Sequence, residues 1–188
     1  SKLVQTEIDG RHLTNEELGA FFVLLSVAGN DTTRNTISLT AMALQDHPEQ
    51  RALLAEDFDG RIKSAVEEFV RFASPVMTFR RTAARDTSIR GQEIKAGEWV
   101  MLMYSSANRD ERAFANPATF DITRSPNPHM AFGGGGPHFC MGSMLAKMQL
   151  EAIFRELILR APTLRVGQPE YLVSNFVRGV KSLPYTLD

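Results

Sequence analysis

The sequence is poor in cysteine, in net charge and in long apolar runs. It has one cysteine in 188 residues, which excludes an internal disulfide framework and zinc sites that need two or more thiolates. A formal net charge of −1 offers no strong field for nucleic acid or for an anionic membrane. The longest apolar stretch, residues 21–28, is far shorter than the ~20 residues of a membrane span, and no signal peptide is visible. We therefore expect a cytoplasmic protein without a membrane span that binds no nucleic acid.

The single cysteine, Cys140, has three possible uses. It can be an inert core residue, a nucleophile, or the only thiolate ligand of an iron cofactor. Because most lone cysteines are inert, only the neighbouring residues can decide between these uses.

Four helices are expected from the apolar pattern. Thr14 can cap the first helix, and Glu17, three residues later, can complete a capping box. That helix is mostly apolar and has few charges before Asp31, so we expect it to be buried over much of its length. The expected helices are residues 18–45, a short segment that begins at Pro48, residues 61–72 and residues 144–160.

The segments between and after these helices have a different character. Residues 76–83, 87–94 and 99–104 are short β-rich runs, and the tail from residue 163 to 187 again predicts strands. Residues 107–137 are irregular and too long for an ordinary connection, which is typical of a functional loop. The fold class is therefore α+β and mainly α.

The start of the chain is abrupt. Residues 1–10 resemble the end of an earlier element, and the most apolar helix follows with nothing before it to cover it. We expect that a substantial N-terminal half of the same protein lies outside these 188 residues.

The most informative stretch surrounds Cys140. Four consecutive glycines, residues 133–136, cannot form regular structure, and they suit a backbone that closely approaches something flat and bulky. Cys140 precedes the helix expected from Met144, whose unpaired N–H groups and positive dipole end can hold a thiolate, and Gly142 keeps side-chain bulk away from the sulfur. A flexible glycine loop beside an incidental cysteine is the alternative.

The pattern Phe-Gly-x-x-Gly-x-His-x-Cys-x-Gly followed by Leu-Ala-Lys resembles the cysteine-ligand loop of the cytochrome P-450 family. The resemblance extends over essentially the whole chain in the family's order, and it covers the family's C-terminal portion. Glu-x-x-Arg at residues 68–71 is weak alone, but all the motifs in order around one cysteine are very specific. These motifs are residues 28–33, 68–71, 81–83, 107–110, 120–124, 127–129 and 132–142.

The resemblance implies a bacterial-class haem-thiolate monooxygenase with a long distal I helix, a K helix, small β-sheets and an L helix. The cofactor would be haem (heme, iron protoporphyrin IX), with Cys140 as the iron ligand. The enzyme would insert one oxygen atom of dioxygen into a small-molecule, apolar organic substrate, such as a steroid or a lipid. Its electrons would come from a ferredoxin-type or flavoprotein partner. Lys147 could contribute to the docking face for that partner. The expected haem-binding residues are Ala28, Gly29, Arg81, His129, Phe132, Gly133, His138, Cys140 and Gly142.

Asp31 and Thr32 correspond to the family's acid–alcohol pair for proton delivery. Thr32 would hydrogen-bond dioxygen or an ordered water, and Asp31 would connect it to solvent. The alternative is a helix kink or internal cap, because a threonine hydroxyl can bond to a carbonyl one turn earlier.

Three further sets of residues take their roles from the resemblance. Glu68 and Arg71 lie one turn apart and suit an ion pair, and Arg124 is the expected third member because the usual position holds Thr119. Arg81 and His129 would bind the haem propionates, with Arg80 as a competitor for Arg81. The substrate side would be lined by Val76, Met77, Phe79 and Phe176, for which ordinary core packing is the alternative.

The loop from Phe132 to Cys140 departs from the family pattern, because it is one residue longer than the commonest spacing. Some actinobacterial members that oxidise steroid side chains or methyl-branched lipids have a similar longer loop. A bulky apolar substrate is therefore expected, by analogy alone. Two alternatives stay open: a peroxide-using or sensing haem-thiolate protein, which would not need Asp31 and Thr32, and a catalytically silent lobe.

Overall fold

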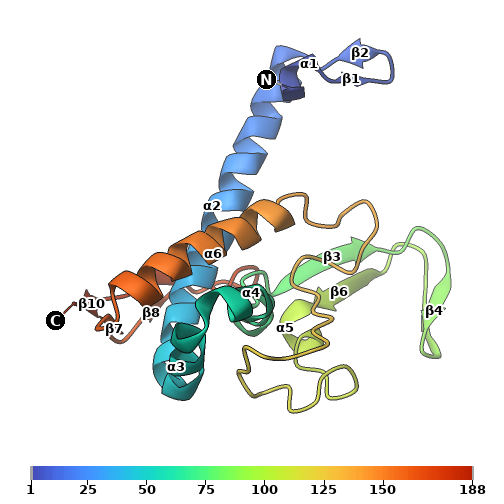
Figure 1. The fold of residues 1–188 in the computed structure, drawn as a ribbon. Coiled ribbons are helices and arrows are strands. Elements are labelled where there is room, and N and C mark those ends of the chain that lie inside the picture. The colour runs from blue at the N-terminus through green and yellow to red at the C-terminus, as the bar shows by residue number, and fades with distance from the viewer. Residues whose placement is uncertain (1, 188) are drawn as a thin grey trace.

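The computed structural model describes residues 2–187 and is mainly helical (Figure 1). Its long helices are α2 (Asn15–Asp46), α3 (Pro48–Glu56), α4 (Phe58–Ala73) and α6 (Ser143–Arg160), and the short ones are α1 (Lys2–Gln5) and α5 (Tyr104–Ala107). No helix within residues 2–187 is both long and apolar enough to cross a bilayer.

The strands are short and pair only antiparallel in the described part of the chain. The pairs are β1 (Glu7–Ile8) with β2 (Arg11–His12), β3 (Thr78–Thr82) with β6 (Trp99–Met103), β4 (Thr87–Ile89) with β5 (Gln92–Ile94), β8 (Glu170–Tyr171) with β9 (Val180–Ser182), and β7 (Arg165–Val166) with β10 (Tyr185–Thr186). The α+β, mainly α class is confirmed. The four helices and the irregular segment before α6 lie where the sequence predicts them, to within a few residues.

The ends of α2 and α4 follow from local side-chain chemistry. Thr14 accepts a hydrogen bond from the N–H of Glu17, whose carboxylate accepts one from the N–H of Thr14, so the predicted capping box is present. Asp57 caps α4 by accepting from the N–H of Gly60, and Ser74 ends that helix in the left-handed region at φ 43°. The Ser74 hydroxyl donates to the carbonyl of Arg71 and satisfies a group that the helix end leaves free.

The hydrophobic core lies where α4 packs against α6 and the C-terminal half of α2. Phe69 is fully buried and contacts the rings of Phe120 and Phe154, which come from the irregular segment and from α6. Other members of this core are Ala43, Leu44, Leu54, Phe58, Ile62, Ala65, Val66, Val70, Ile122, Leu150 and Ile158.

The prediction that α2 is buried over much of its length is wrong for this chain. Only six of its residues, from Asn35 to Leu44, are buried, while apolar residues of its first half such as Phe22 and Leu24 are 70% and 60% exposed. The first half of α2 projects away from α3, α4 and α6 (Figure 1). The apolar pattern identifies a surface suited to burial, but it does not show which part of the chain covers it.

Candidate functional site

Cys140 lies in a glycine-rich loop that ends at the start of α6. Its N–H donates to the carbonyl of Phe132 at 2.9 Å, which closes the loop on itself. Gly133, Gly135 and Gly136 have φ values of 92°, 98° and 75°, a region that other residues rarely adopt, so these glycines make the turn possible. The thiol of Cys140 is free and half-buried.

Gly142 is the N-cap residue of α6 and lies beside the sulfur. A Cβ atom at this position would be 3.9 Å from Cys140 Sγ, which is an ordinary contact that a longer side chain would extend towards the thiol. Apolar side chains surround the loop and the first turns of α6, and they are exposed: Phe139, Met141, Met144, Leu145 and Met148. His138 is also exposed.

On α2, Ala28 and Gly29 are exposed, and a Cβ atom on Gly29 would meet nothing within 4 Å. Thr32 Oγ1 donates to the carbonyl of Ala28 at 2.7 Å, which is the bond that the helix-capping alternative requires. Asp31 is half-exposed and forms an ion pair with Arg34 at 3.4 Å. The Thr32 hydroxyl uses its one proton in the bond to Ala28. Its oxygen can still accept a hydrogen bond from another group.

A hollow of about 450 Å³ lies between α2 and α6. Gly29 is the only expected cofactor residue on its wall, and Asp31 and Thr32 do not line it. Its wall consists of Gly29, Asn30, Thr33, Arg34, Ile37, Ser38 and Gln149.

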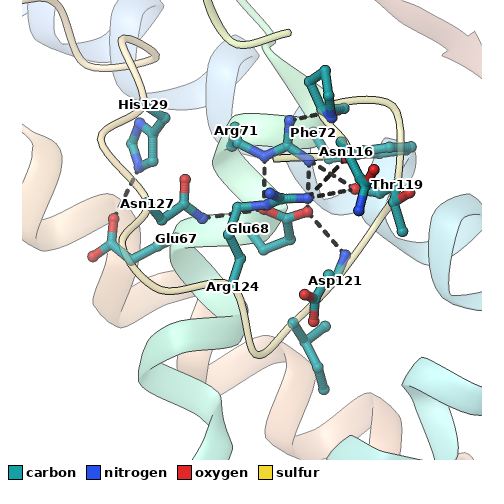
Figure 2. Close-up of polar contacts among 12 residues, drawn as sticks. Glu67, Glu68, Arg71, Phe72, Asn116, Thr119, Asp121, Arg124, Asn127 and His129 are labelled. Carbon is teal, nitrogen blue, oxygen red and sulfur yellow. Dashed lines mark hydrogen bonds and ion pairs between the residues drawn. The ribbon is translucent and has the colours of Figure 1, made fainter. Parts of the chain in front are cut away.

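Glu68, Arg71 and Arg124 are brought together in one ionic cluster (Figure 2). The Arg71 guanidinium bonds both oxygens of Glu68 at 2.7 Å, and Arg124 Nε lies 3.2 Å from Glu68 Oε2. Glu68 and Arg71 are fully buried, so each charge depends on the other for compensation. Thr119, the position that lacks an arginine, contributes its carbonyl, which accepts from both arginines.

This cluster organises the irregular segment that leads to Cys140. Arg71 also donates to the carbonyls of Asn108 and Pro117, and Arg124 donates to those of Ala115 and Asn116. The segment in turn donates to Glu68 from the N–H of Asp121 and from the amide of Asn127. A chain without regular structure thus has its backbone groups satisfied by three charged side chains.

Asn108 belongs to the motif at residues 107–110, but its buried contacts were not predicted from the sequence. Its amide nitrogen donates to Ser74 Oγ at the end of α4, and its side-chain oxygen accepts the N–H of Met130 at 2.7 Å. It therefore ties the end of α4 to the segment before the cysteine loop. The neighbouring Arg109 donates to the carbonyl of Phe72, and burial lowers its pKa from the usual value.

His129 and Lys147 meet on Glu67, a contact that the sequence also did not reveal. His129 Nε2 lies 2.9 Å and Lys147 Nζ 2.5 Å from the two oxygens of this carboxylate (Figure 2 shows the histidine contact). The second ring nitrogen of His129 accepts the N–H of Ala131 at 3.3 Å. Both residues thus have partners within the chain, although a propionate and a protein partner were expected for them.

Arg80 and Arg81 point to different environments, as neighbours on a strand do. The Arg80 guanidinium lies over the ring of Trp99 at 4.0 Å from its centroid. Arg81 shares its face of β3 with Phe79, 5.8 Å from that ring, and donates to the carbonyl of Arg80.

The residues expected to line the substrate side come together at one end of β3. Val76 pairs with Val177 in a β-bridge, and the N–H of Met77 donates to the carbonyl of Phe176 at 2.8 Å. The rings of Phe79 and Phe176 meet edge to face at 5.2 Å, and both are partly exposed.

Comparison with known proteins identifies the family to which this chain belongs. A family model described as cytochrome P-450 matches residues 1–161. The chain belongs to the cytochrome P-450 family. The methyl-branched lipid omega-hydroxylase of Mycobacterium tuberculosis is 50% identical over 187 residues, covering 99% of this chain and 44% of that relative. The steroid C26-monooxygenase of Rhodococcus jostii is 46% identical over 180 residues, covering 95% of this chain and 38% of that relative.

Solved cytochromes P-450 share the fold. A Mycobacterium marinum cytochrome P-450 in complex with pseudoionone superimposes with a TM-score of 0.94 at 56% identity, covering 98% of this chain and 45% of that one. This chain therefore spans less than half the length of each of these relatives.

The residues around Cys140 fit the haem of a cytochrome P-450. The donor set is a single free thiol, and no group of three or more His, Cys, Asp or Glu side chains in residues 2–187 could hold a bare metal ion. One thiolate beside exposed apolar side chains is the environment of an iron held mainly by a large apolar macrocycle.

Proposed function

We propose that this chain is the haem-binding portion of a haem-thiolate monooxygenase that oxidises an apolar organic substrate, such as a steroid or a lipid. The observation that carries the proposal is Cys140, a free thiol in a glycine-rich turn directly before α6 with apolar side chains around it. The names of its relatives, a lipid hydroxylase and a steroid monooxygenase, support the same class of reaction.

Bound haem would supply the redox centre at which dioxygen is reduced and one of its oxygen atoms passes to the substrate. Cys140 would hold the iron as a thiolate, supported by the positive end of the α6 dipole. Ala28 and Gly29 would leave the distal side free of bulk. Arg81 is our choice over Arg80 for a propionate, because Arg80 is stacked on Trp99. The loop residues that would enclose the cofactor are Phe132, Gly133, His138 and Gly142.

His129 is a weaker candidate than Arg81 for binding a haem propionate. Its two ring nitrogens already contact Glu67 and Ala131, so it could reach a carboxylate only by giving up one of these bonds.

Asp31 and Thr32 would manage protons on the α2 side. Thr32 donates to the Ala28 carbonyl, so its oxygen can accept from an ordered water, and Asp31 is exposed enough to exchange protons with solvent. Thr32→Ala should uncouple oxygen consumption from product, with a loss of about 10²-fold in coupled turnover. Thr33→Ala, which removes a neighbouring hydroxyl, is the matched control and should stay coupled. Full coupling in Thr32→Ala would leave the helix-capping role as the explanation.

The substrate would lie against Val76, Met77, Phe79 and Phe176. The edge-to-face pair of Phe79 and Phe176 gives that side an apolar, partly exposed surface. A methyl-branched lipid or a steroid side chain would suit this apolar surface. Such substrates also agree with the names of the relatives, a methyl-branched lipid omega-hydroxylase and a steroid C26-monooxygenase. A screen of such compounds for ligand-induced spin-state changes in the haem-loaded protein tests the assignment.

Electrons would come from a ferredoxin-type or flavoprotein partner in the cytoplasm. A single cysteine suits a reducing compartment. Lys147 would contribute little to docking, because only about a third of its side chain is exposed and it is paired with Glu67.

The deciding experiment is the absorption spectrum of the reduced, carbon-monoxide-bound protein. We expect the Soret band of a haem thiolate, and Cys140→Ser should abolish that band. A protein that binds haem without this band in the native sequence would refute the thiolate assignment. A chain that takes up no haem would favour the silent-lobe alternative, which the exposed first half of α2 also favours for the 188-residue chain alone.

A further inference from the structure

Glu67 lies directly before Glu68 on α4 but belongs to a different network. Its carboxylate accepts from His129 Nε2 at 2.9 Å and from Lys147 Nζ at 2.5 Å. His129 lies before the glycine-rich loop, and Lys147 lies on α6 after it. One carboxylate on α4 therefore joins the two segments of chain that flank Cys140.

Phe132 connects this network to the cysteine. Its ring lies 5.7 Å from the ring of His129, centroid to centroid, and Lys147 Nζ is 5.4 Å from its centroid. The carbonyl of Phe132 accepts the N–H of Cys140 at 2.9 Å. A displacement of the Phe132 ring would therefore move the group that holds the cysteine backbone.

The hydrogen bonds fix the arrangement of protons in the network. The N–H of Ala131 points at His129 Nδ1, so Nε2 carries the hydrogen that is donated to Glu67. Only 5% of the His129 side chain is exposed, and a third of each of the Glu67 and Lys147 side chains. The hydrogen bond from His129, followed by that from Lys147, holds the pKa of Glu67 below its usual value despite partial burial. Glu67 is therefore anionic at neutral pH.

We propose that Glu67 is a positioning residue for the Cys140 thiolate, acting with His129 and Lys147 through Phe132. This inference rests on the proposed haem-thiolate function. It assigns His129 and Lys147 to the support of the cysteine loop in place of a propionate and a redox partner. No other contact in the described part of the chain joins both flanks of the loop through one carboxylate.

The test uses the haem-loaded protein and two readouts other than activity. The first is the fraction of the reduced, carbon-monoxide-bound protein that loses the thiolate-type Soret band across a pH series. Glu67→Gln and Lys147→Met should each raise that fraction by about three- to tenfold, because each removes a charge-assisted hydrogen bond. Lys147→Arg, which keeps the charge and the donor, should restore the native spectrum.

The second readout is the haem reduction potential, which separates positioning from simple charge. Glu67→Gln removes a negative charge and should raise the potential, whereas Lys147→Met removes a positive charge and should lower it. In the double variant the two shifts should largely cancel, while the loss of the thiolate-type band should persist. If the thiolate-type band recovered in the double variant, the charges of Glu67 and Lys147 alone would explain the effects of the single variants. That result would overturn the proposal.

Asp59 provides the matched control. It forms an ion pair with Arg155, so this pair also joins α4 to α6, but at an exposed position without contact to Phe132. Asp59→Asn should leave the spectrum and the potential unchanged. Suppose that the native protein shows the thiolate-type band and that the spectrum of Glu67→Gln equals that of Asp59→Asn. This result would overturn the positioning role of Glu67 but not the proposed function. Native protein that binds haem without that band would overturn the proposed function as well.

The variant Lys147→Met leaves the Glu67–His129 bond in place. If Glu67→Gln does not fold, the spectrum of Lys147→Met tests the positioning role in its place.

Discussion

The two halves of α2 lie in very different surroundings. The C-terminal half packs against α4 and α6, and its buried Asn35 accepts the N–H of Val180 on β9 at 2.9 Å. The N-terminal half is more apolar in sequence, yet Phe22 and Leu24 are mostly exposed. The same helix thus belongs to a closed core at one end and to an open surface at the other. Its stability within this chain must come mainly from the closed end.

The largest effect is expected from the ionic cluster of α4, the helix against which the C-terminal half of α2 packs. Glu68→Ala should destabilise the chain by about 3–5 kcal/mol, because it leaves Arg71 buried without its counter-charge. Denaturant unfolding of the 188-residue chain measures the loss. The exposed pair of Lys181 and Glu170 is the control, and Lys181→Met should cost about 0–1 kcal/mol. Equal costs for the two variants would show that the cluster does not hold the irregular segment in place.

The helices were largely predictable because their signals are local. The capping box at Thr14, the proline at the start of α3 and the apolar spacing of α4 and α6 all lie within a few residues of the elements they define. The pair Glu68 and Arg71 was accessible for the same reason, since its members are three residues apart.

The long-range contacts of the site were not predictable from the sequence by physical reasoning. The bond from Lys147 to Glu67 spans 80 residues, and Asn108 reaches Met130 across an irregular segment. Neither leaves a periodic or spacing signal. The burial of α2 was predicted wrongly for a related reason, because apolar character does not show which surface, if any, will cover it.

A second prediction sharpens the contrast between the two ends of α2. Leu44 is 3% exposed and Leu24 is 60% exposed on the same helix. Leu44→Ala should cost the chain about 2–5 kcal/mol, because it leaves a cavity in the core. Leu24→Ala should stay within about 0.5 kcal/mol, because its side chain already contacts water. Both are measured by denaturant unfolding of the 188-residue chain, and a large loss in Leu24→Ala would mean that the first half of α2 is covered in solution.

The smallest expected effect lies at the exposed start of α2. Glu17 accepts bonds from the Arg11 guanidinium and from the N–H of Thr14, and these, the arginine first, lower its pKa to about 2. A carboxyl whose pKa falls on folding stabilises the folded state above its ordinary pKa, and that contribution is lost as the pH falls towards 2. Carboxyl-carbon NMR should therefore show Glu17 titrating near pH 2, with fraying of the first turn over the same range.

Arg11→Gln should return the titration of Glu17 most of the way to its ordinary pH. Because both side chains are solvated, salt should weaken the effect, whereas it should hardly change the buried Glu68–Arg71 pair. A Glu17 titration that ignores both Arg11→Gln and salt would assign the shift to the helix dipole and the Thr14 bond instead.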